Sequence, residues 1–160
     1  KHNIIPNEVK LQLTVRTTKD SVRKQVLEAI ARIAKAAAAG ARAPEPVIKV
    51  DLDEWTPALV NDKDLSRQTV ALFREALGED RVHERPPVMG GEDFSRYGKE
   101  GVPIFLYFVG TQPPERVAAA AKEGRELPSL HSSTFYPVPE PTLRTGVTTM
   151  SLAVLNLLGR

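Results

Sequence analysis

The stretch VPIFLYFVG, residues 102–110, is a nearly continuous apolar run that begins after Gly101 and ends at Gly110. Strands that are buried on both faces have this pattern, because helices cover both sides of a mainly parallel sheet. The run therefore predicts an inner strand of an α/β sheet. The neighbouring segments must then supply the covering helices and the other strands.

Apolar residues spaced three and four positions apart predict helices over residues 20–40, 63–78 and 139–159. A helical turn is also expected at 116–123. Asp20 is the expected N-cap of the first helix, and Asn61 or Asp62 that of the second. The residues expected to face inward are Val22, Val26, Ile30, Ile33 and Ala37, then Leu65, Leu72, Phe73 and Ala76, then Leu143, Val147, Met150, Val154 and Leu158.

Further strands are predicted before, between and after these helices. VKLQLTVR, residues 9–16, alternates apolar and polar residues, as a half-buried strand does. PVIKVDL, residues 46–52, reads as a second strand, and RVHERPPVMGGEDF, residues 81–94, as a short strand that leads into a glycine turn. The pattern predicts an α+β unit followed by a mixed α/β unit, with WTPALVND, residues 55–62, at the junction.

Composition limits the function classes. The chain has 160 residues, of which 41% are hydrophobic and 26% charged, as in globular proteins. Its 22 basic and 20 acidic residues leave a net charge of +2, too small to predict a nucleic acid or membrane partner. With no cysteine, the chain has neither disulfides nor a cysteine-based zinc site. Because it starts at Lys1 and enters a predicted strand almost at once, we expect it to come from inside a longer protein.

His131 is the first candidate functional residue. It lies in LPSLHSSTF, residues 127–135, a loop-like stretch between the apolar run and the last helix. Loops beyond the strands of α/β sheets often bind ligands, and imidazole is a common metal ligand. The alternative is a loop histidine that is hydrogen-bonded to the backbone.

Three other positions are candidates for ligand contact. In VMGGEDF, residues 88–94, Gly90 and Gly91 would let a ligand approach the backbone closely, whereas the alternative is a plain turn before a helix. Arg16 can hold a carboxylate through two parallel hydrogen bonds, whereas the alternative is a solvated residue on a strand face. Asn3 lies 13 residues before Arg16, at the other end of the same strand unit.

Four segments together resemble landmarks of the M20 metallopeptidases. They are NIIPNEVKLQLTVRT, WTPALVND, MGGEDFSRY and LHSSTFYPVPEPTLRTGV, and they occur in the family's order along essentially the whole chain. The amidohydrolase branch, which includes the N-acyl-amino-acid and indoleacetyl-amino-acid hydrolases, is the most similar. Two departures are Asn7, where an aspartate is common, and Trp55-Thr56-Pro57, where Tyr-Pro-Pro is common.

The resemblance implies a fold and a division of the chain. Residues 1–55 would be the second half of a ferredoxin-like α+β lid, of the kind that also mediates dimerisation. Residues 56–160 would be the C-terminal part of an α/β, two-metal, aminopeptidase-like catalytic domain. The N-terminal half of the same enzyme would precede Lys1.

The resemblance also implies a chemistry, the cleavage of an amide bond in N-acyl amino acids or small peptides by metal-activated water. His131 matches the family's C-terminal metal ligand, Asn3 and Arg16 match substrate-binding lid residues, and Gly90 and Gly91 match a loop near the substrate. The other ligands of two divalent ions, and the glutamate general base, would lie on the N-terminal half. Zinc is the first choice of metal, with manganese, cobalt or nickel as alternatives.

The expected partners are the N-terminal half, a small N-acyl amino acid or peptide substrate, and a second copy through the lid. The isolated chain is expected to be inactive. A different class of function is a non-catalytic remnant or interaction module. Nucleic-acid binding is disfavoured because VKLQLTVR has no aromatic residues on which bases could stack. The compartment is left open.

Overall fold

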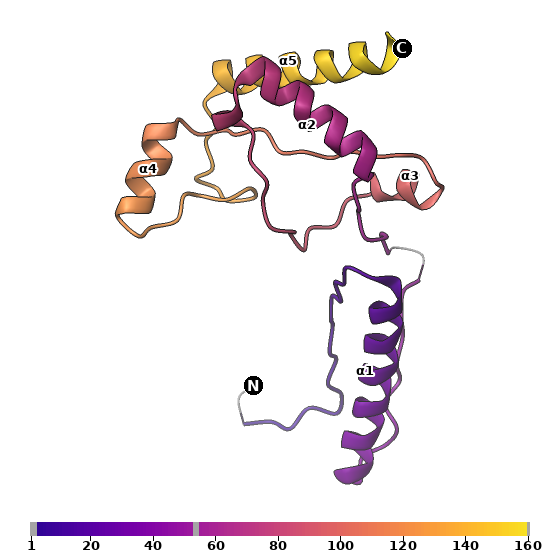
Figure 1. Ribbon diagram of the computed structural model, residues 1–160. Coiled ribbons are helices and arrows are strands. Elements are labelled where there is room, and N and C mark those ends of the chain that lie inside the picture. Colours follow the sequence, from indigo (N-terminus) through magenta and orange to yellow (C-terminus); the bar gives the residue numbers. More distant parts are fainter. Residues whose placement is uncertain (1–2, 53–54, 160) are drawn as a thin grey trace. The chain divides into compact units, whose positions relative to one another are not determined.

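The computed structural model describes residues 3–52 and 55–159. Along the chain lie α1 (Asp20–Gly40), α2 (Lys63–Leu77), the 3-10 helix η1 (Glu79–Arg81), α3 (Ser95–Lys99), α4 (Pro114–Lys122) and α5 (Pro139–Leu158) (Figure 1). The chain packs as two compact units. Unit 1 comprises Lys1–Val60 and Pro86–Ile104, and unit 2 comprises Asn61–Arg85 and Phe105–Arg160. The assignment of lid and catalytic portions stays a prediction.

The three long predicted helices are confirmed as α1, α2 and α5, and the predicted helical turn as α4. The ends of α2 have clear causes. Asp62 caps the helix, because its Oδ1 accepts a hydrogen bond from the N–H of Leu65 at 2.8 Å. Gly78 ends it with φ of +99°, a conformation that residues with a Cβ rarely adopt.

Asp20 has a different role from the one predicted. Lys19 occupies the N-cap position of α1 without a side-chain cap, and Asp20 is the first helical residue. Its carboxylate lies 2.5 Å from the Nζ of Lys99, the last residue of α3. Asp20 therefore joins two helices of unit 1, and its charge also favours the helix N-terminus.

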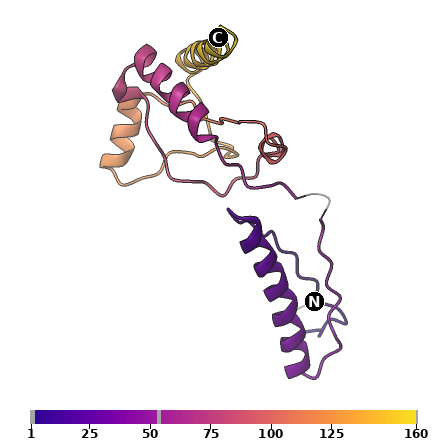
Figure 2. The same cartoon turned by 45° about the vertical axis from the view of Figure 1, so that its right-hand side comes forward.

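Extended segments precede and follow α1 in unit 1 (Figures 1 and 2). The helix has no fully buried residue. Of its predicted inward stripe, Val26 and Ile30 are half-buried, as expected, but Val22 and Ile33 are 41% and 58% exposed. The apolar face of α1 is therefore only partly covered.

The predicted strands are not found among the described residues. Residues 9–16 and 46–52 are extended but form no β-ladder with another described segment, and Leu11 and Leu13 are 80% and 65% exposed. The segment 81–94 forms the end of η1 and then runs without regular structure. A strand needs a hydrogen-bonded neighbour. The alternation in the sequence therefore specifies an extended segment, and the described chain provides no strand to pair with it.

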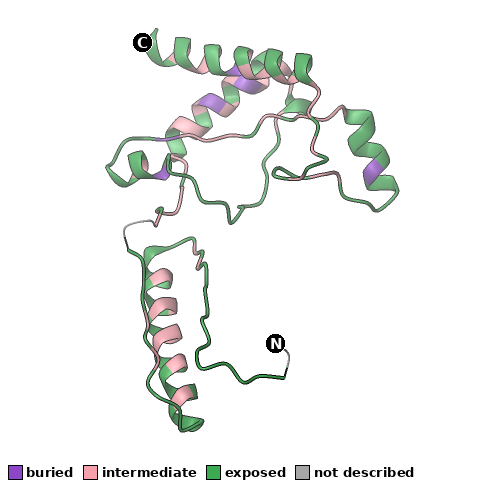
Figure 3. Ribbon diagram, turned by 180° about the vertical axis from the view of Figure 1, so that it is seen from behind, coloured by how far each residue is buried: buried purple, intermediate pink, exposed green. Residues whose placement is uncertain are grey.

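In unit 2, α2 packs against α5, and the buried positions of the two helices lie along this contact (Figure 3). Phe73 of α2 is 4% exposed, and its ring lies 6.4 Å from that of Phe105 and 5.0 Å from that of Tyr107, centroid to centroid. From α5, the buried Thr149 reaches the same cluster through a hydrogen bond of 2.9 Å with the hydroxyl of Tyr107.

The run 102–110 enters this cluster as an extended segment. The predicted inner strand is wrong, because this segment forms no β-ladder with another described segment. Leu106, at its centre, bonds to a side chain. The amide of Asn61 donates from Nδ2 to the carbonyl of Leu106 and accepts at Oδ1 from its N–H, both at 2.8 Å. One asparagine thus supplies the two hydrogen bonds that a neighbouring strand would have given.

The prediction for α5 is wrong in orientation. Its apolar stripe is exposed, between 43% at Val154 and 77% at Leu158. The less exposed positions of α5 include Thr145 and the buried Thr149, whose hydroxyl contacts Tyr107. The larger apolar residues of the predicted stripe therefore do not form the covered side of the helix. This exposed stripe consists of Leu143, Val147, Met150, Val154 and Leu158.

Candidate functional site

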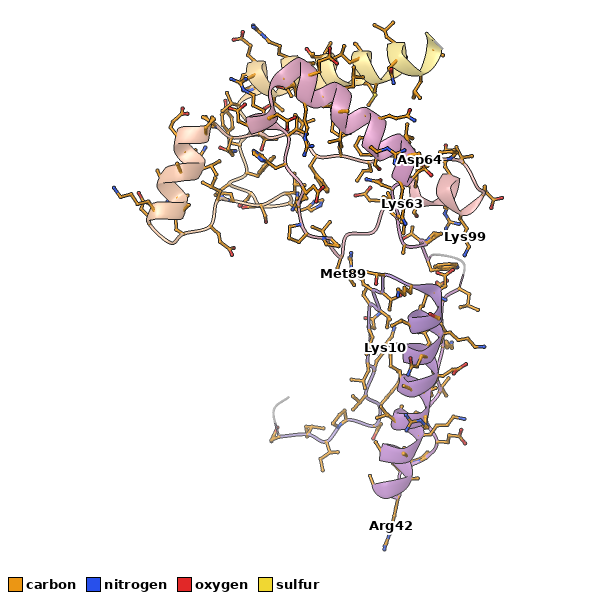
Figure 4. The ribbon with its side chains drawn as sticks, in the orientation of Figure 1. Lys10, Arg42, Lys63, Asp64, Met89 and Lys99 are labelled. Carbon is orange, nitrogen blue, oxygen red and sulfur yellow. The ribbon has the colours of Figure 1, made fainter. Side chains whose placement is uncertain are left out.

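Arg16 contacts the backbone just before the glycine pair. Its Nη1 donates to the carbonyl oxygen of Met89 at 2.6 Å, across 73 residues of sequence. Both residues belong to unit 1, where Figure 4 labels Met89. The sequence singled out Arg16 and Gly90–Gly91 separately, and the fold brings them together. The contact involves a main-chain atom, so no residue pattern could have indicated it.

The fold of the described chain does not require glycine at position 90 or 91. Neither residue has a positive φ. A Cβ on Gly90 would have no atom within 4 Å, and one on Gly91 would meet only the Oγ1 of Thr56, at 3.4 Å. Both glycines are exposed. The pair therefore offers open backbone that another molecule can approach more closely than it could approach a residue with a side chain.

The loop is held on both sides of the glycines. Arg16 binds the carbonyl of Met89 on one side. On the other, the hydroxyl of Ser95 donates to the carbonyl of Glu92 at 2.5 Å, and Ser95 is 1% exposed. Among the described residues, none forms a hydrogen bond to the N–H of Gly90 or Gly91. The loop is thus fixed at its ends, with two backbone donors open to solvent.

His131 lies in a tight turn of unit 2 with φ of +68°. The turn is closed by hydrogen bonds from the N–H of Ser132 to the carbonyl of Ser129 and from the N–H of Phe135 to the carbonyl of Ser132, both 3.1 Å. The imidazole is exposed, and no described residue forms a hydrogen bond with it. A left-handed backbone is unusual for histidine and costs about 1 kcal/mol or more. The turn therefore presents a free imidazole to solvent.

Asn3 is not brought to the other candidates. It is an exposed residue of a turn, and an extended segment separates it from Arg16 (Figure 1). No contact links Asn3 to Arg16, Gly90 or Gly91 among the residues that the structure describes. Its role stays a prediction.

A complete metal site is not present in residues 3–52 and 55–159, which contain no cluster of three or more histidine, cysteine, aspartate or glutamate side chains suited to a metal ion. Zinc bound by protein typically needs three or four such ligands. The described residues do not fit a metal centre by themselves, although His131 offers one exposed donor.

In the described part of the chain, no helix combines the length and the apolar character needed to cross a membrane.

Comparisons with known proteins extend these observations. The chain is 28% identical over 156 residues to the thermostable carboxypeptidase 2 of Saccharolobus solfataricus, a match that covers 98% of this chain and 36% of that protein. It is 35% identical over 115 residues to the N-acetylcysteine deacetylase of Bacillus subtilis, a match that covers 71% of this chain and 28% of that protein. It is 42% identical over 59 residues to the IAA-amino acid hydrolase ILR1-like 2 of Arabidopsis thaliana, a match that covers 37% of this chain and 13% of that protein.

The chain therefore spans about a third of the length of the carboxypeptidase, 36%, and less of the other two. The sequence model of the M20/M25/M40 peptidases matches residues 5–133, which include Arg16, both loop glycines and His131. This match extends over most of the chain, and the resemblance seen in the four sequence segments agrees with it. The chain belongs to peptidase family M20/M25/M40.

Proposed function

We propose that this chain is part of a metal-dependent hydrolase that cleaves the amide bond of N-acyl amino acids or small peptides. The observation that carries the proposal is the contact between Arg16 and the carbonyl of Met89 at 2.6 Å. It places a cation that suits a substrate carboxylate beside the open backbone of Gly90 and Gly91. Relatives named as a carboxypeptidase, a deacetylase and an amino acid conjugate hydrolase support the same reaction class.

Arg16 would select substrates that end in a free carboxylate. A guanidinium carries five N–H donors, and the bond to Met89 uses Nη1 alone. The remaining donors are available to a ligand, because the side chain is exposed. A carboxylate bound to these donors would lie next to the glycine loop. The N–H groups of Gly90 and Gly91 belong to the same unit of the chain as Arg16.

His131 would provide one metal ligand. The exposed imidazole supports this role, and the hydrogen-bonded turn fixes the backbone that carries it. Bound divalent ions, with zinc the first choice, would supply polarisation of the substrate carbonyl and an acidic water. The remaining ligands and the general base would come from the N-terminal portion of the enzyme.

Exposed apolar side chains support such an additional portion. The stripe of α5 that consists of Leu143, Val147, Met150, Val154 and Leu158 is between 43% and 77% exposed, and apolar side chains gathered on one helix face commonly mark a surface that another segment covers. We propose that the N-terminal portion covers the outward apolar stripe of α5, and that a second copy adds a strand beside the extended segment 9–16 of unit 1.

The alternative, a non-catalytic interaction module, is favoured by the same stripe. Apolar side chains that are exposed along one face of a helix commonly mark a docking site for protein. The two hypotheses predict different compositions of the purified protein. Mass spectrometry should detect an additional N-terminal polypeptide if the chain is part of an enzyme, and this chain alone if it is an interaction module.

The test of the proposed function is hydrolysis of an N-acetyl amino acid with zinc or manganese present. The 160-residue chain alone should be inactive, and activity should appear when an N-terminal portion of a family enzyme is supplied on the same polypeptide. Replacing Arg16 with alanine should then raise KM for the acid and leave KM for the corresponding amide unchanged. Equal effects on acid and amide would contradict the role of Arg16, and metal-independent hydrolysis by the chain alone would contradict the whole proposal.

A further inference from the structure

Trp55 contacts residues of two helices of unit 1. The guanidinium of Arg23, in the first turns of α1, lies over its ring at 4.4 Å from the centroid. Its carbonyl accepts a hydrogen bond of 2.8 Å from Nη2 of Arg96 in α3. One residue thus binds two cations from two helices, and neither contact includes a carboxylate.

The same link reaches the glycine loop. Thr56 follows Trp55, and its Oγ1 is the one described atom close to where a Cβ on Gly91 would lie, at 3.4 Å. Arg96 follows Ser95, whose hydroxyl fixes the carbonyl of Glu92 at the end of the loop. Trp55 is therefore bonded to α3, which follows the loop, and its neighbour Thr56 lies near Gly91.

The ion pair of Asp20 and Lys99, 2.5 Å, connects the same two helices (Figure 4 labels Lys99). Together these contacts fix α1 to α3 on one side of the loop, whereas Arg16 fixes Met89 on the other. Arg16 itself lies only four residues before Asp20, so a displacement of α1 would move both attachments of the loop.

We infer that Trp55 is a positioning residue for the Gly90–Gly91 loop. Trp55 acts by holding Arg23 and Arg96, and it touches no ligand itself. Its relevance to catalysis rests on the proposed function, whereas its effect on the loop does not. If the loop meets substrate, a shift of the loop misaligns the substrate, and a displacement of about 1 Å can reduce turnover by about 100-fold.

A matched pair of substitutions tests the inference. Arg85 lies over the ring of Phe108 in unit 2, also at 4.4 Å from the centroid. Arg23→Ala and Arg85→Ala therefore each remove one guanidinium from one aromatic face, but only the first removes it from Trp55. Trp55→Leu removes the ring, and Trp55→Phe keeps an aromatic face for Arg23.

The readout is the amide resonances of glycine in the chain labelled with ¹⁵N at glycine only, in the form in which the protein is isolated. The chain has ten glycines, so the spectrum is sparse. Arg23→Ala and Trp55→Leu should shift the resonances of Gly90 and Gly91, Trp55→Phe should restore them, and Arg85→Ala should leave them in place. Unmoved resonances in Arg23→Ala and Trp55→Leu overturn the inference. Equal shifts at Gly146 of α5 also overturn it, because the role would then be general stability.

Activity is measured separately in an enzyme that contains this chain. Arg23→Ala should reduce kcat/KM for an N-acetyl amino acid by about 100-fold, and Arg85→Ala by less than about twofold. If the loop resonances respond as expected and the unsubstituted enzyme hydrolyses no such substrate, the proposed function fails and the positioning role stands. If the enzyme is active and Arg23→Ala retains full activity despite shifted resonances, the catalytic part of the inference is overturned.

Discussion

Asn61 and Leu106 are joined by two hydrogen bonds of 2.8 Å between one side-chain amide and one backbone position, 45 residues apart. Asn61→Asp keeps the shape of the side chain but removes the donor, so the carbonyl of Leu106 loses its partner. Loss of one partner from a part-buried hydrogen bond costs about 1–3 kcal/mol. We expect the free energy of unfolding to fall by about that amount in urea titrations at pH 7. Asn7→Asp, at an exposed position, is the control, and an equal effect there would point to net charge as the cause.

The hydroxyls of Tyr107 and Thr149 should be energetically coupled. They lie 2.9 Å apart, and the hydroxyl of Thr149 also donates to the carbonyl of Thr145 at 2.8 Å. Tyr107→Phe and Thr149→Val should each destabilise the protein by about 1 kcal/mol. Because both remove the same hydrogen bond, the double variant should lose less than the sum. Strict additivity in a double-mutant cycle of unfolding free energies would contradict the coupling.

Stability should depend on pH through Glu45. A hydrogen bond from Lys35, with Nζ and Oε1 2.6 Å apart, and the positive charge of Lys35 lower the pKa of Glu45 below its usual value. A carboxylate with a lowered folded-state pKa stabilises the protein above its unfolded-state pKa. That contribution disappears as the pH falls through the folded-state value. Lys35→Met should thus reduce the free energy of unfolding at pH 7 and have little effect at low pH. Both residues are more than half exposed, so high salt should also suppress the difference.

Gly90→Ala should leave stability unchanged within about 0.5 kcal/mol, because a Cβ there meets no atom within 4 Å. In an active enzyme it should nevertheless raise KM, since the new methyl group occupies the approach to the backbone. Gly98→Val is the contrasting variant: its Cβ would lie 2.7 Å from the Cδ1 of the buried Ile104. It should cost about 1–3 kcal/mol through overpacking. Unchanged kinetics in Gly90→Ala would remove Gly90 from the proposed substrate contacts.

Two substitutions at position 131 separate the backbone from the imidazole. His131→Ala keeps a Cβ at φ of +68°, whereas His131→Gly removes it. We expect the glycine variant to be more stable than the alanine variant by about 1 kcal/mol. Both should lose metal from an active enzyme to the same extent, as measured by elemental analysis alongside hydrolysis. Full metal occupancy in either variant would return His131 to the role of a turn residue.

The helices could be predicted because their signals are local. Periodicity, Asp62 as a cap and Gly78 as a stop each act within a few residues of the chain. The orientation of α5 was predicted wrongly because a hydrophobic stripe indicates only that a face needs covering. It does not say which neighbour covers it. In the described chain, α5 buries Thr149 and leaves the larger apolar residues of its stripe exposed.

The prediction of strands was wrong for a related reason, because a strand needs a second segment to pair with. The alternation in residues 9–16 correctly indicates extended backbone but cannot supply a partner. In the site, Arg16, Gly90, Gly91 and His131 were identified from residue type and family resemblance. The connections through Met89 and Trp55 were missed, since each uses a backbone carbonyl. Main-chain acceptors are the same at every position, so only three-dimensional structure reveals them.

Trp55 is the single tryptophan of the chain, and the cation of Arg23 lies over its ring. Its fluorescence therefore comes from one place, and the emission should change when Arg23 moves away. Unit 2 has no tryptophan, so its unfolding can be followed separately through the amide resonance of Gly146 in α5. Coincidence of the two transitions would indicate that both units unfold together, whereas separate midpoints would give each unit its own stability. The arrangement of one indole beneath one guanidinium thus gives the protein an intrinsic optical reporter for the loop of Gly90 and Gly91.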